Sequence, residues 1–314
     1  MPKVLIAGGA GFIGTHMTEY LLKRGWEVVS VDNFSTGKRE NVERFRGDPR
    51  FTFHEMDITE AVPEGDYDYI INLASPASPQ KYLSLPLDTM LVNSIGVKNL
   101  LDLAKRSGAT FLLASTSEVY GDPLVHPQPE TYWGNVNPVG PRSVYDEGKR
   151  FAEAITMAYH RYEGVPVRIA RIFNTYGPYM DVADGRIISN FASQALLGKP
   201  LTIYGDGSQT RSFCYVSDMV EGLFRLLTYE GLDGEVVNLG NPEEWRVIDV
   251  AKLVVRLLGL EENFSFLPLP QDDPKRRKPD ITKAKRLLGW EPKVPFEEGL
   301  RRTLKWYREV LNVG

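Results

Sequence analysis

Tyr145 and Lys149 stand four residues apart in the segment YDEGK. If this segment is helical, both side chains project from one face of the helix. A free tyrosine has a pKa of ~10 and is a poor base at neutral pH, but a nearby positive charge favours the tyrosinate. The pair can then shuttle the proton of an alcohol hydroxyl group. The same spacing also occurs on the surfaces of many helices, so the surrounding fold decides between the two interpretations.

The segment STSEVYGDP, residues 115–123, contains one glutamate, Glu118, behind a row of hydroxyl groups. A single acid beside a reaction centre can position a water molecule, relay a proton or orient a sugar ring. The residue type alone does not choose among these roles. The alternative is a buried structural carboxylate that is satisfied by backbone N–H groups, since an unpaired buried charge is costly.

Gly8, Gly11 and Gly14 follow the apolar run VLIA and open a segment with helical spacing. Glycines at these positions permit a tight turn and a close approach of the backbone to a pyrophosphate, which the helix N-terminus attracts. Asp32 ends the next apolar run, EVVSVD, 18 residues after Gly14. A carboxylate there accepts both ribose hydroxyl groups of NAD and repels a 2′-phosphate. Asp32 therefore disfavours NADP, but the basic pair at 38–39 could bind a 2′-phosphate, so NADP is not excluded. The alternative for the whole segment is a glycine-rich turn that binds no ligand.

A third apolar segment is followed by Asp57 in HEMDIT, at the predicted end of a strand. This carboxylate either accepts a hydrogen bond from an adenine amino group or caps the N-terminus of a helix. The sequence supports both interpretations equally.

Short apolar runs alternate with longer segments of helical spacing in the first half of the chain. The segments THMTEYLLKRG and NSIGVKNLLDLAKRSG carry apolar residues at i, i+3 and i+4 and end at glycine. The predicted strands between such segments are 4–7, 28–31, 69–73, 110–114 and 167–172. Strands separated by covering helices indicate a parallel sheet with helices on both faces. We therefore predict an α/β fold, a Rossmann-type doubly wound parallel sheet with a smaller, loop-rich C-terminal substrate domain.

The pattern changes after Asn174, where proline, glycine and tyrosine become frequent in stretches such as NTYGPYM and FLPLPQDDPKRRKPD. This composition is typical of loops that cover a pocket. The helical segment VSDMVEGLFRLLTY and the apolar run EVVNLG interrupt it and are expected to return to the main sheet. We predict a dinucleotide-binding domain from residues 1–174 plus 212–240, and a substrate-binding domain from residues 175–211 plus 241–314.

The composition of the 314-residue chain is that of a soluble globular protein, with 42% hydrophobic and 25% charged residues. A net charge of −4 offers no basic surface for nucleic acid. No apolar run approaches the ~20 residues of a membrane span and no signal-peptide pattern precedes Val4, so we expect a cytoplasmic protein with no membrane partner. The one cysteine, Cys214, excludes an internal disulfide and fits a reducing compartment. The four histidines lack metal-ligand spacing, and no metal site is predicted.

Together, the glycine triplet, STSEVYG and the Tyr145-x-x-x-Lys149 pair resemble the extended short-chain dehydrogenase/reductases that act on nucleotide sugars. The resemblance runs from Val4 to about Leu300. More narrowly, NLASPASPQKY, WGNVNPVGPRSVYDEGKR, RIFNTYGPYM, DGRIISNF, YGDGSQTRSFCYVSD and RRKPDI are similar to the family of UDP-glucuronate decarboxylases, also called UDP-xylose synthases. These motifs are longer and more specific than the glycine spacing.

The resemblance implies that UDP-glucuronate is converted to UDP-xylose while NAD⁺ is reduced and then regenerated. Tyr145 takes the proton of the C4 hydroxyl group, Thr116 hydrogen-bonds that oxygen, and a hydride leaves C4. The resulting 4-keto sugar is a β-keto acid, which loses CO₂ readily before the hydride returns. Related 4,6-dehydratases carry an Asp–Glu pair, whereas Ser117 precedes Glu118 here. Because decarboxylation expels no hydroxyl group, one acid suffices.

Other functions remain open on sequence alone. A UDP-sugar 4-epimerase or a nucleotide-sugar 4,6-dehydratase uses the same scaffold, and a GDP-mannose-type dehydratase can also carry a Ser–Glu step. A non-catalytic NAD-binding regulator is a further alternative, but it should have lost Tyr145 or Lys149, and both are present.

The resemblance also implies contacts residue by residue. The predicted NAD contacts are Gly8, Gly11, Phe12, Ile13, Gly14, Asp32, Asn33, Ser35, Thr36, Gly37, Asp57, Ile58, Leu73, Ala74, Tyr82, Tyr145 and Lys149. The predicted substrate contacts are Asn174, Arg186, Asn190, Tyr204, Gln209, Arg211 and Arg277, and the predicted catalytic residues are Tyr145, Lys149, Thr116, Glu118 and Arg277. Arg277 would bind the substrate carboxylate or a diphosphate oxygen, and a solvated basic loop is the alternative.

Two helical segments, NSIGVKNLLDLAKR and EGKRFAEAITMAYHRY, carry more apolar residues than one covering face needs. These residues are Leu100, Leu101, Leu103, Phe151, Ile155, Met157 and Tyr159. The resembling family pairs such helices in a four-helix bundle, so we predict a homodimer. The alternative is that all of these side chains pack inward on the sheet.

Overall fold

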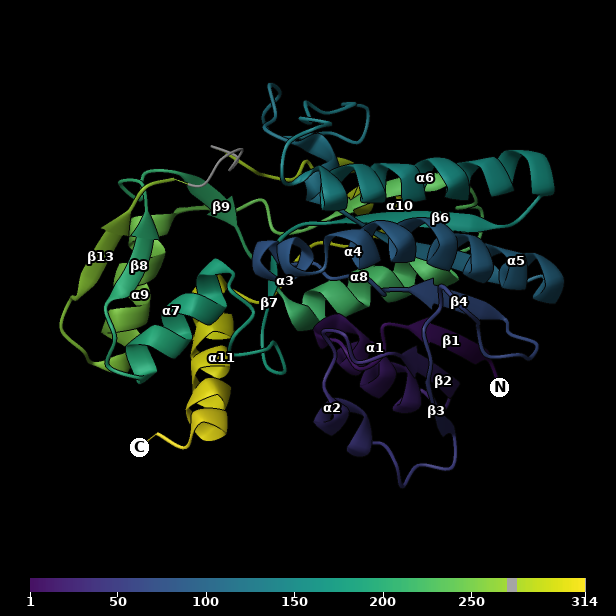
Figure 1. Cartoon of the computed structure of the whole chain (residues 1–314), viewed down its shortest axis with the longest axis horizontal. Helices are drawn as coiled ribbons and strands as arrows, with labels where there is room; N and C mark the ends of the chain where they lie inside the picture. Colours follow the sequence, from purple (N-terminus) through teal and green to yellow (C-terminus); the bar gives the residue numbers. More distant parts are fainter. Residues whose placement is uncertain (270–275, 314) are drawn as a thin grey trace.

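A computed structural model describes residues 1–269 and 276–313 of the chain (Figure 1). Its centre is a seven-stranded parallel sheet in the order β11-β6-β5-β4-β1-β2-β3. The strands are β1 (Lys3–Ala7), β2 (Glu27–Asp32), β3 (Phe51–Glu55), β4 (Tyr69–Asn72), β5 (Thr110–Thr116), β6 (Val167–Ile172) and β11 (Glu235–Leu239). The strand order reverses between β1 and β4, where doubly wound sheets open a crevice for ligands. The predicted Rossmann-type fold is confirmed, including the return of the EVVNLG segment to the sheet.

Both faces of this sheet are buried. In β1, Val4 and Ile6 belong to one hydrophobic cluster, whereas Leu5 and Ala7 belong to another. Successive side chains of a strand point to opposite faces, so a strand that is covered on both sides must be apolar throughout. This requirement explains why the strand signal in the sequence is a continuous apolar run rather than an alternation.

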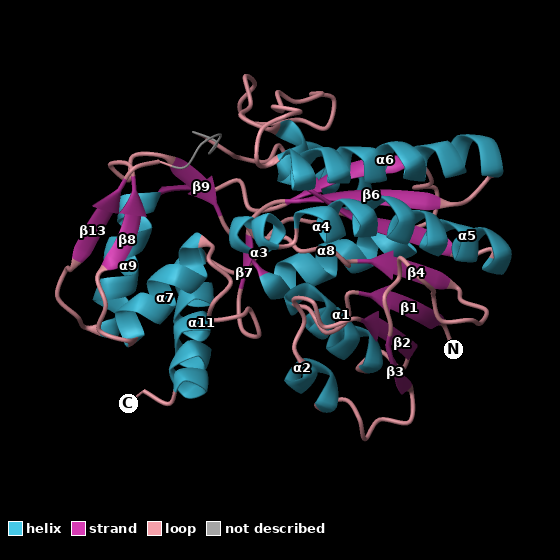
Figure 2. Cartoon of the chain, viewed as in Figure 1, coloured by secondary structure: helices cyan, strands magenta, loops and turns pink. Residues whose placement is uncertain are grey.

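Helices cover the two faces of the sheet (Figure 2). One face carries α5 (Val97–Ser107) and α6 (Ser143–Glu163), preceded by α4 (Pro86–Leu91) and a π-helical turn, η1 (Val92–Gly96); the other carries α1 (Phe12–Leu22), α8 (Val216–Thr228) and α10 (Thr282–Leu288). α5 ends at Gly108 and α6 at Gly164, both in the left-handed conformation. Glycine adopts this conformation without the strain of a Cβ atom, which is why the predicted helix stops hold.

The second part of the molecule lies beside the sheet, at the left of Figure 1. Its elements are α7 (Ile187–Leu196), α9 (Val247–Leu258), α11 (Phe296–Leu311), and the paired strands β8 (Leu201–Tyr204) with β13 (Phe264–Leu267), β9 (Thr210–Ser212) with β12 (Glu244–Arg246), and β7 (Thr175–Tyr176) with β10 (Cys214–Tyr215). α7 packs against α9 and α11. These helices form the frame of the part that was expected to be loop-rich, and the loops connect them.

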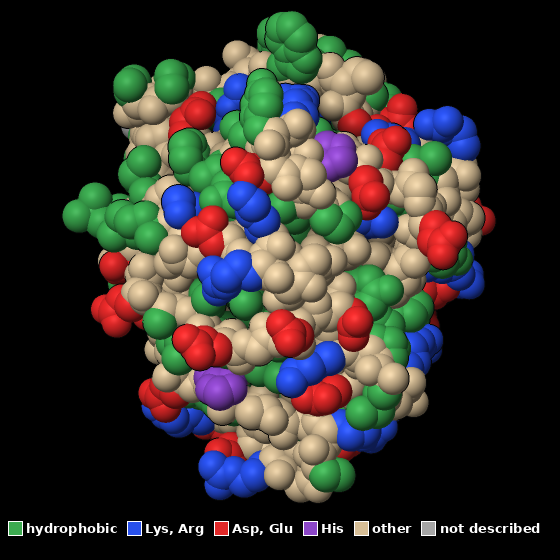
Figure 3. Space-filling view, turned by 90° about the vertical axis from the view of Figure 1, so that its right-hand side faces the viewer, with side chains coloured by type: hydrophobic (Ala, Val, Ile, Leu, Met, Phe, Trp, Pro, Cys, Tyr) green, Lys and Arg blue, Asp and Glu red, His purple; other side chains and the backbone are tan. Residues whose placement is uncertain are grey.

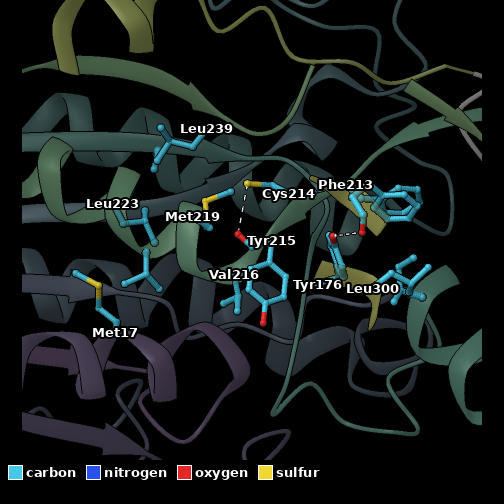
Figure 4. Packing of buried hydrophobic residues seen from close by; sticks show 14 of the residues in the cluster. Met17, Tyr176, Phe213, Cys214, Tyr215, Val216, Met219, Leu223, Leu239 and Leu300 are labelled. Carbon is cyan, nitrogen blue, oxygen red and sulfur yellow. Dashed lines mark hydrogen bonds between the residues drawn. The ribbon is translucent and has the colours of Figure 1, made fainter. Parts of the chain in front are cut away.

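One hydrophobic cluster joins the two parts of the molecule (Figure 4). Met17 of α1 and Met219 of α8 belong to it together with Phe213 and Leu300 of α11. Cys214 is buried in the same cluster as a free thiol. Because side chains from both parts share one core, the two parts pack directly against each other.

Most strand ends lie within one residue of the prediction, and two that carry predicted site residues differ by two. β5 extends to Thr116, two residues beyond its predicted end, so Thr116 is the last strand residue and Glu118 lies in the following 3₁₀ turn, η2 (Ser117–Tyr120). β3 ends at Glu55, opposite Asp32 of β2, and Asp57 lies in the turn beyond it. β3 is an edge strand, and it stops where its one neighbour stops.

The apolar residues expected at a dimer interface divide between two environments. Leu100, Leu101 and Leu103 are buried against the sheet. These three side chains therefore follow the inward alternative, because the sheet-facing side of α5 spans all three positions. Phe151 of α6, by contrast, is 50% exposed.

Within residues 1–269 and 276–313, the helices are too short or too polar to cross a lipid bilayer. Acidic and basic side chains are interspersed over the face shown in Figure 3. No single-sign field dominates that face, in agreement with the small net charge of the chain.

Candidate active site

Two adjoining cavities lie at the carboxyl ends of the parallel strands. The larger has a volume of about 800 Å³ and the smaller about 330 Å³. Both are lined by Gly8 and Gly11 after β1, by Thr36 after β2 and by Leu73 after β4. They therefore meet at the point where the strand order reverses, which is the expected ligand crevice of this fold.

The glycine turn between β1 and α1 leaves no room for side chains. Gly8 has a φ of +81°, and a Cβ atom there would lie 2.7 Å from the backbone nitrogen of Ala74. A Cβ atom on Gly14 would lie 2.2 Å from the carbonyl oxygen of Gly8. The backbone of the turn is thus open toward the cavity and the N-terminus of α1 faces it, as a bound pyrophosphate requires.

Asp32 ends β2 and lines the smaller cavity. Its carboxylate accepts hydrogen bonds from the backbone N–H of Ala10 at 3.0 Å and of Phe34 at 2.8 Å. Burial raises the pKa of Asp32, and these two hydrogen bonds oppose the shift. Gly37 lines neither cavity but contacts this carboxylate, since a Cβ atom on it would lie 2.9 Å from Asp32 Oδ1. The fixed carboxylate fits the ribose of NAD, as predicted, and the glycine turn fits the pyrophosphate.

Asp57 and Ile58 line the smaller cavity as well. One oxygen of Asp57 accepts from the backbone N–H and the hydroxyl group of Thr59, at 2.8 and 2.7 Å, and the other accepts from the Asn33 amide at 2.9 Å. Burial opposes the effect, but these bonds lower the pKa of Asp57. No helix follows Asp57 in the described segment before β4, so the helix-cap alternative is wrong: the carboxylate closes the turn at residues 58–60. It lies at the smaller cavity, where the adenine end of the cofactor is expected.

Tyr145 and Lys149 lie on the inner face of α6, both buried, and line the larger cavity. Lys149 Nζ donates to the carbonyl oxygen of Ala114 at 2.9 Å and lies 5.9 Å from the centre of the Tyr145 ring. Burial lowers the pKa of Lys149 to about 8, against the opposing charge of Glu153. Burial raises the pKa of Tyr145, and hydrogen bonding with the Thr116 side chain opposes this shift. The ammonium group was expected to favour the tyrosinate, but burial has the larger effect here.

Tyr82, predicted to line the nicotinamide half of the pocket, stacks on Tyr145. The ring centres are 5.0 Å apart and the rings are within 2° of parallel. Its buried hydroxyl group has no hydrogen-bond partner among the described residues. The stacked pair forms one wall of the larger cavity, which restricts how Tyr145 can approach a reacting sugar.

Glu118, which lines the same cavity as Tyr145, is held between two arginines. Arg142 donates to its Oε2 at 2.6 Å, and Arg277 donates to its Oε1 and, at 3.1 Å, to the carbonyl oxygen of Gly121. Although burial alone would raise it, the charges of Arg277 and Arg142 lower the pKa of Glu118 to about 2. The structural alternative considered for Glu118, satisfaction by backbone N–H groups, is therefore wrong, because guanidinium groups satisfy it. The solvated-loop alternative for Arg277 is also wrong, since this side chain is buried.

All predicted substrate contacts line the larger cavity. They are Asn174, Arg186, Asn190, Tyr204, Gln209, Arg211 and Arg277. Some are positioned by short local bonds: Arg186 Nε donates to Asp184 at 2.6 Å, and the Gln209 amide donates to the carbonyl oxygen of Tyr204 at 2.7 Å. The remaining predicted NAD contacts, Phe12, Ile13, Asn33, Ser35 and Ala74, line one of the two cavities.

Among the charged residues of the larger cavity, sequence reasoning missed Arg142, Lys81, Asp181 and Asp184, and it did not place Lys38 in the cavity. Arg142 stands three residues before Tyr145, almost one helical turn, and that spacing was the signal available. Lys38 and Lys81 each pair with Asp181, which is distant in the sequence, so no local pattern marks them. Among the described residues, no group of three or more histidine, cysteine or acidic side chains is placed to hold a metal ion.

Comparison with known proteins places this chain among nucleotide-sugar enzymes. The sequence model described as GDP-mannose 4,6-dehydratase matches residues 5–303. UDP-glucuronic acid decarboxylase 1 of Xenopus tropicalis is 55% identical over 309 residues, which are 98% of this chain and 73% of that protein. UDP-glucuronic acid decarboxylase 2 of Arabidopsis thaliana is 55% identical over 307 residues, 98% of this chain and 68% of that protein.

A solved structure gives the same fold with its ligands bound. UDP-glucuronic acid 4-epimerase from Bacillus cereus, in complex with UDP-glucuronic acid and NAD, superimposes with a TM-score of 0.88 at 29% identity. The match covers 98% of this chain and 99% of the epimerase.

Proposed function

Because this chain belongs to the GDP-mannose 4,6-dehydratase family, whose members bind NAD, we propose that it decarboxylates UDP-glucuronate to UDP-xylose. The observation that carries the proposal is the convergence of Arg142 and Arg277 on Glu118 beside Tyr145. Both guanidinium groups line the larger cavity, and a guanidinium group binds a carboxylate with two parallel hydrogen bonds, which suits a sugar that carries its own carboxylate. The identity to UDP-glucuronic acid decarboxylases over nearly the whole chain supports the same substrate.

The first step removes the C4 hydroxyl proton. Tyr145 takes this proton, Thr116 hydrogen-bonds the oxygen, and Lys149 supports the phenolate from one turn along α6. The residues around the glycine turn and Asp32 would hold NAD, which would supply the hydride acceptor for this step and the hydride donor at the end of the cycle. The product is a 4-keto sugar with its carboxylate on C5.

The second step releases CO₂. The C5–carboxyl bond breaks and its electron pair moves into the C4 carbonyl group as an enolate. Arg142 and Arg277 orient the carboxylate of the sugar. Because Glu118 partly neutralises both guanidinium groups, they bind the sugar carboxylate weakly enough for CO₂ to leave. One solvent proton then adds at C5, and Tyr145 returns its proton to the C4 oxygen as the ketone is reduced. The net reaction consumes one proton and leaves the cofactor unchanged.

A UDP-glucuronate 4-epimerase is the second candidate. The epimerase from Bacillus cereus shares the fold, binds UDP-glucuronic acid and contains NAD. An epimerase must prevent the 4-keto acid from losing CO₂. The reaction therefore depends on whether the cluster of Arg142, Glu118 and Arg277 prevents or allows this loss.

One incubation separates these functions. Purified protein with NAD⁺ and UDP-glucuronate is followed by NMR of the sugar and by CO₂ release, and we expect a UDP-pentose with equimolar CO₂. A six-carbon C4 epimer without CO₂ identifies the epimerase, and an unchanged substrate contradicts both proposals. Tyr145→Phe is the matched control, since it removes only the proton acceptor and should abolish turnover.

We also propose that the chain is a homodimer, with an interface different in detail from the one expected. Leu87, Met90 and Leu91 of α4, Ile95 of η1 and Phe151 of α6 are exposed, and these elements pack together. Contiguous exposed apolar side chains mark association sites. A second copy that presents the same face would form a bundle of two helices from each protomer.

The domain division and the compartment remain proposals. We assign NAD binding to residues 1–174 plus 212–240 and nucleotide-sugar binding to 175–211 plus 241–314, of which residues 270–275 and 314 lie outside the described part. α10 is an exception in its packing, since it contacts β11 and α8 of the sheet. We propose that the protein is cytoplasmic, where the free thiol of Cys214 stays reduced. Detection of the protein in another fraction of the cells that express it would contradict this location.

A further inference from the structure

We propose that residues 177–186, GPYMDVADGR, form a strap across the cofactor crevice, and that Asp181 holds the strap closed by pairing with Lys38 and Lys81. The inference rests on the proposed use of NAD, and it concerns cofactor retention rather than the chemistry of the sugar. The strap follows β7 and leads into α7, so its backbone belongs to the second part of the molecule. The two lysines belong to the sheet side.

The ion pairs connect opposite walls of one cavity. Lys38 Nζ lies 2.8 Å from Asp181 Oδ1, and Lys81 Nζ lies 3.6 Å from Asp181 Oδ2. Lys38 directly precedes α2 (Arg39–Glu43), and Lys81 lies in α3 (Pro79–Ser84). All three side chains line the larger cavity. A ligand in the crevice is therefore enclosed by contacts that must break before it can leave.

Further contacts fasten the start of the strap to the sheet side. His16 Nε2 of α1 donates to the carbonyl oxygen of Pro178 at 2.8 Å. The guanidinium group of Arg44 lies 4.0 Å from the centre of the Tyr179 ring. Tyr179 has a φ of +67°, so its backbone is in the left-handed region that a bulky residue adopts only under constraint. The constraint places the ring between the two parts of the molecule.

On its own side the strap is anchored independently of the lysines. Ser193 of α7 donates to the carbonyl oxygen of Val182 at 2.7 Å, and the hydroxyl group of Tyr307 in α11 donates to that of Asp181 at 3.4 Å. The strap can therefore lose its contacts to the sheet side while α7 and α11 keep its base in place. The Asp181 pairs, together with the contacts that His16 and Arg44 make, are the interactions that break when the strap opens.

The cofactor must stay bound throughout the cycle, because the hydride that it takes from C4 is returned to the same sugar. If the reduced cofactor left between the two hydride transfers, the ketone could not be reduced and the sugar would be lost as a dead-end product. The Asp181 side chain is 21% exposed and those of Lys38 and Lys81 are 39% and 32% exposed. Ion pairs of this exposure are weak and screened by salt, so the strap should open more often as ionic strength rises.

The test measures NADH release from the whole protein without any sugar nucleotide, by stopped-flow fluorescence after mixing with excess NAD⁺. The variants are Asp181→Asn, Lys38→Met and the double variant, with Asp48→Asn as a matched control whose carboxylate pairs with Arg50 in a surface turn. We expect Asp181→Asn, which removes both ion pairs, to release NADH about fivefold faster, and Lys38→Met, which removes one of them, to release it no faster than that. The double variant should match Asp181→Asn, because the Lys38 pair is already absent there. Added salt should accelerate release from the wild-type protein and have less effect on Asp181→Asn.

Three results would each contradict the proposed strap. They are unchanged NADH release from Asp181→Asn, equal acceleration by Asp48→Asn, and a release about 25-fold faster in the double variant, which would mean that the two changes act independently. Because the assay needs no sugar, its result is separate from the proposed function. A protein that retains NADH in this way but leaves UDP-glucuronate intact would refute the decarboxylase and leave the strap standing.

Discussion

Glu118 shares its two oxygens between Arg142 and Arg277, and this decides what the carboxylate can do. An acid whose pKa is about 2 is ionised across the working range of most enzymes, so it accepts hydrogen bonds and does not donate a proton. Of the three roles open on sequence, orientation is the one that this geometry favours. The acid orients two guanidinium groups, and through them the carboxylate of the sugar.

Glu118→Gln tests this role at nearly constant volume. The amide cannot balance two guanidinium groups, so we expect them to shift and kcat for CO₂ release to fall roughly a hundredfold, the effect of misplacing a substrate by about 1 Å. Single-turnover absorbance of NADH and CO₂ release, measured separately, locate the affected step. Glu163→Gln, at the far end of α6 and paired with Lys105, is the control. Normal rates for every step in Glu118→Gln would contradict the orienting role.

Lys149 gives a prediction about stability and pH. Its pKa is lowered to about 8 by burial, from 10.5, so between these values the unfolded chain binds more protons than the folded one. Stability contributed by this group therefore rises as pH increases through that window, and the cost of burying the charge is present below it. Compared with Lys149→Met, the wild-type free energy of unfolding should gain up to about 3 kcal/mol between pH 7 and pH 10.5. Urea titrations of both proteins measure the free energy of unfolding at each pH. A constant difference between the two proteins across this range would show that the pKa of Lys149 is not lowered by folding.

The connection between β1 and α1 shows how an element sets up chemistry that none of its side chains performs. The turn brings Gly8, Gly11 and Gly14 so close to one another, and Gly8 so close to the backbone just after β4, that the turn itself lines the cavity. The helix that follows starts without a side-chain cap at Gly11, which leaves its N–H groups free to bind an anion. The element therefore contributes position and dipole, while α6 contributes the reacting side chains.

Gly14→Ala tests the element. The added methyl group would lie 2.2 Å from the Gly8 carbonyl oxygen, so the backbone must move. We expect a loss of about 1–3 kcal/mol in the free energy of unfolding, as for other overpacked sites, and at least about tenfold weaker NADH binding by fluorescence titration. Gly47→Ala is the control, because nothing lies within 4 Å of its added Cβ atom. Equal NADH affinity in the two variants would argue against a close approach of this turn to the cofactor.

At the scale of the whole molecule, the site lies between two parts that share one hydrophobic core. The sheet side supplies the cofactor residues, and the part of the chain after Asn174 supplies most of the substrate residues, some from α7, β8 and β9. The exposed side chains on α4, η1 and α6 lie on the outside of the helix that carries Tyr145 and Lys149. A partner on that face would therefore also hold the catalytic helix in place.

Leu87→Asp tests the interface at its most exposed apolar residue, which is 72% exposed. We expect the wild-type protein to sediment as a dimer and the variant to dissociate with a constant at least about tenfold higher, since a charge would be buried in an apolar interface. Leu260→Asp, an exposed leucine after α9, is the control in the same sedimentation experiment. A monomeric wild-type protein, or a variant that stays dimeric, would contradict this interface.

The sequence by itself determined the sheet, its cofactor turn and the reacting pair. These features depend on local rules: apolar runs for buried strands, glycines where a Cβ atom cannot fit, and a spacing of four residues between Tyr145 and Lys149 on one helical face. Such rules act within a few residues, so they can be read before the chain is folded. The resemblance then supplied the substrate residues, and these line the larger cavity.

Only the tertiary structure decided which charges meet. Glu118 contacts Arg277 across 159 positions of sequence, and Asp181 contacts Lys38 from the other part of the molecule. Neither pairing has a local signal, because the packing of distant elements brings the groups together and burial then sets their pKa values. The same reason explains why Leu100, Leu101 and Leu103 turned inward, since sequence spacing gives the apolar faces of a helix and only the packed fold shows which neighbour each face meets.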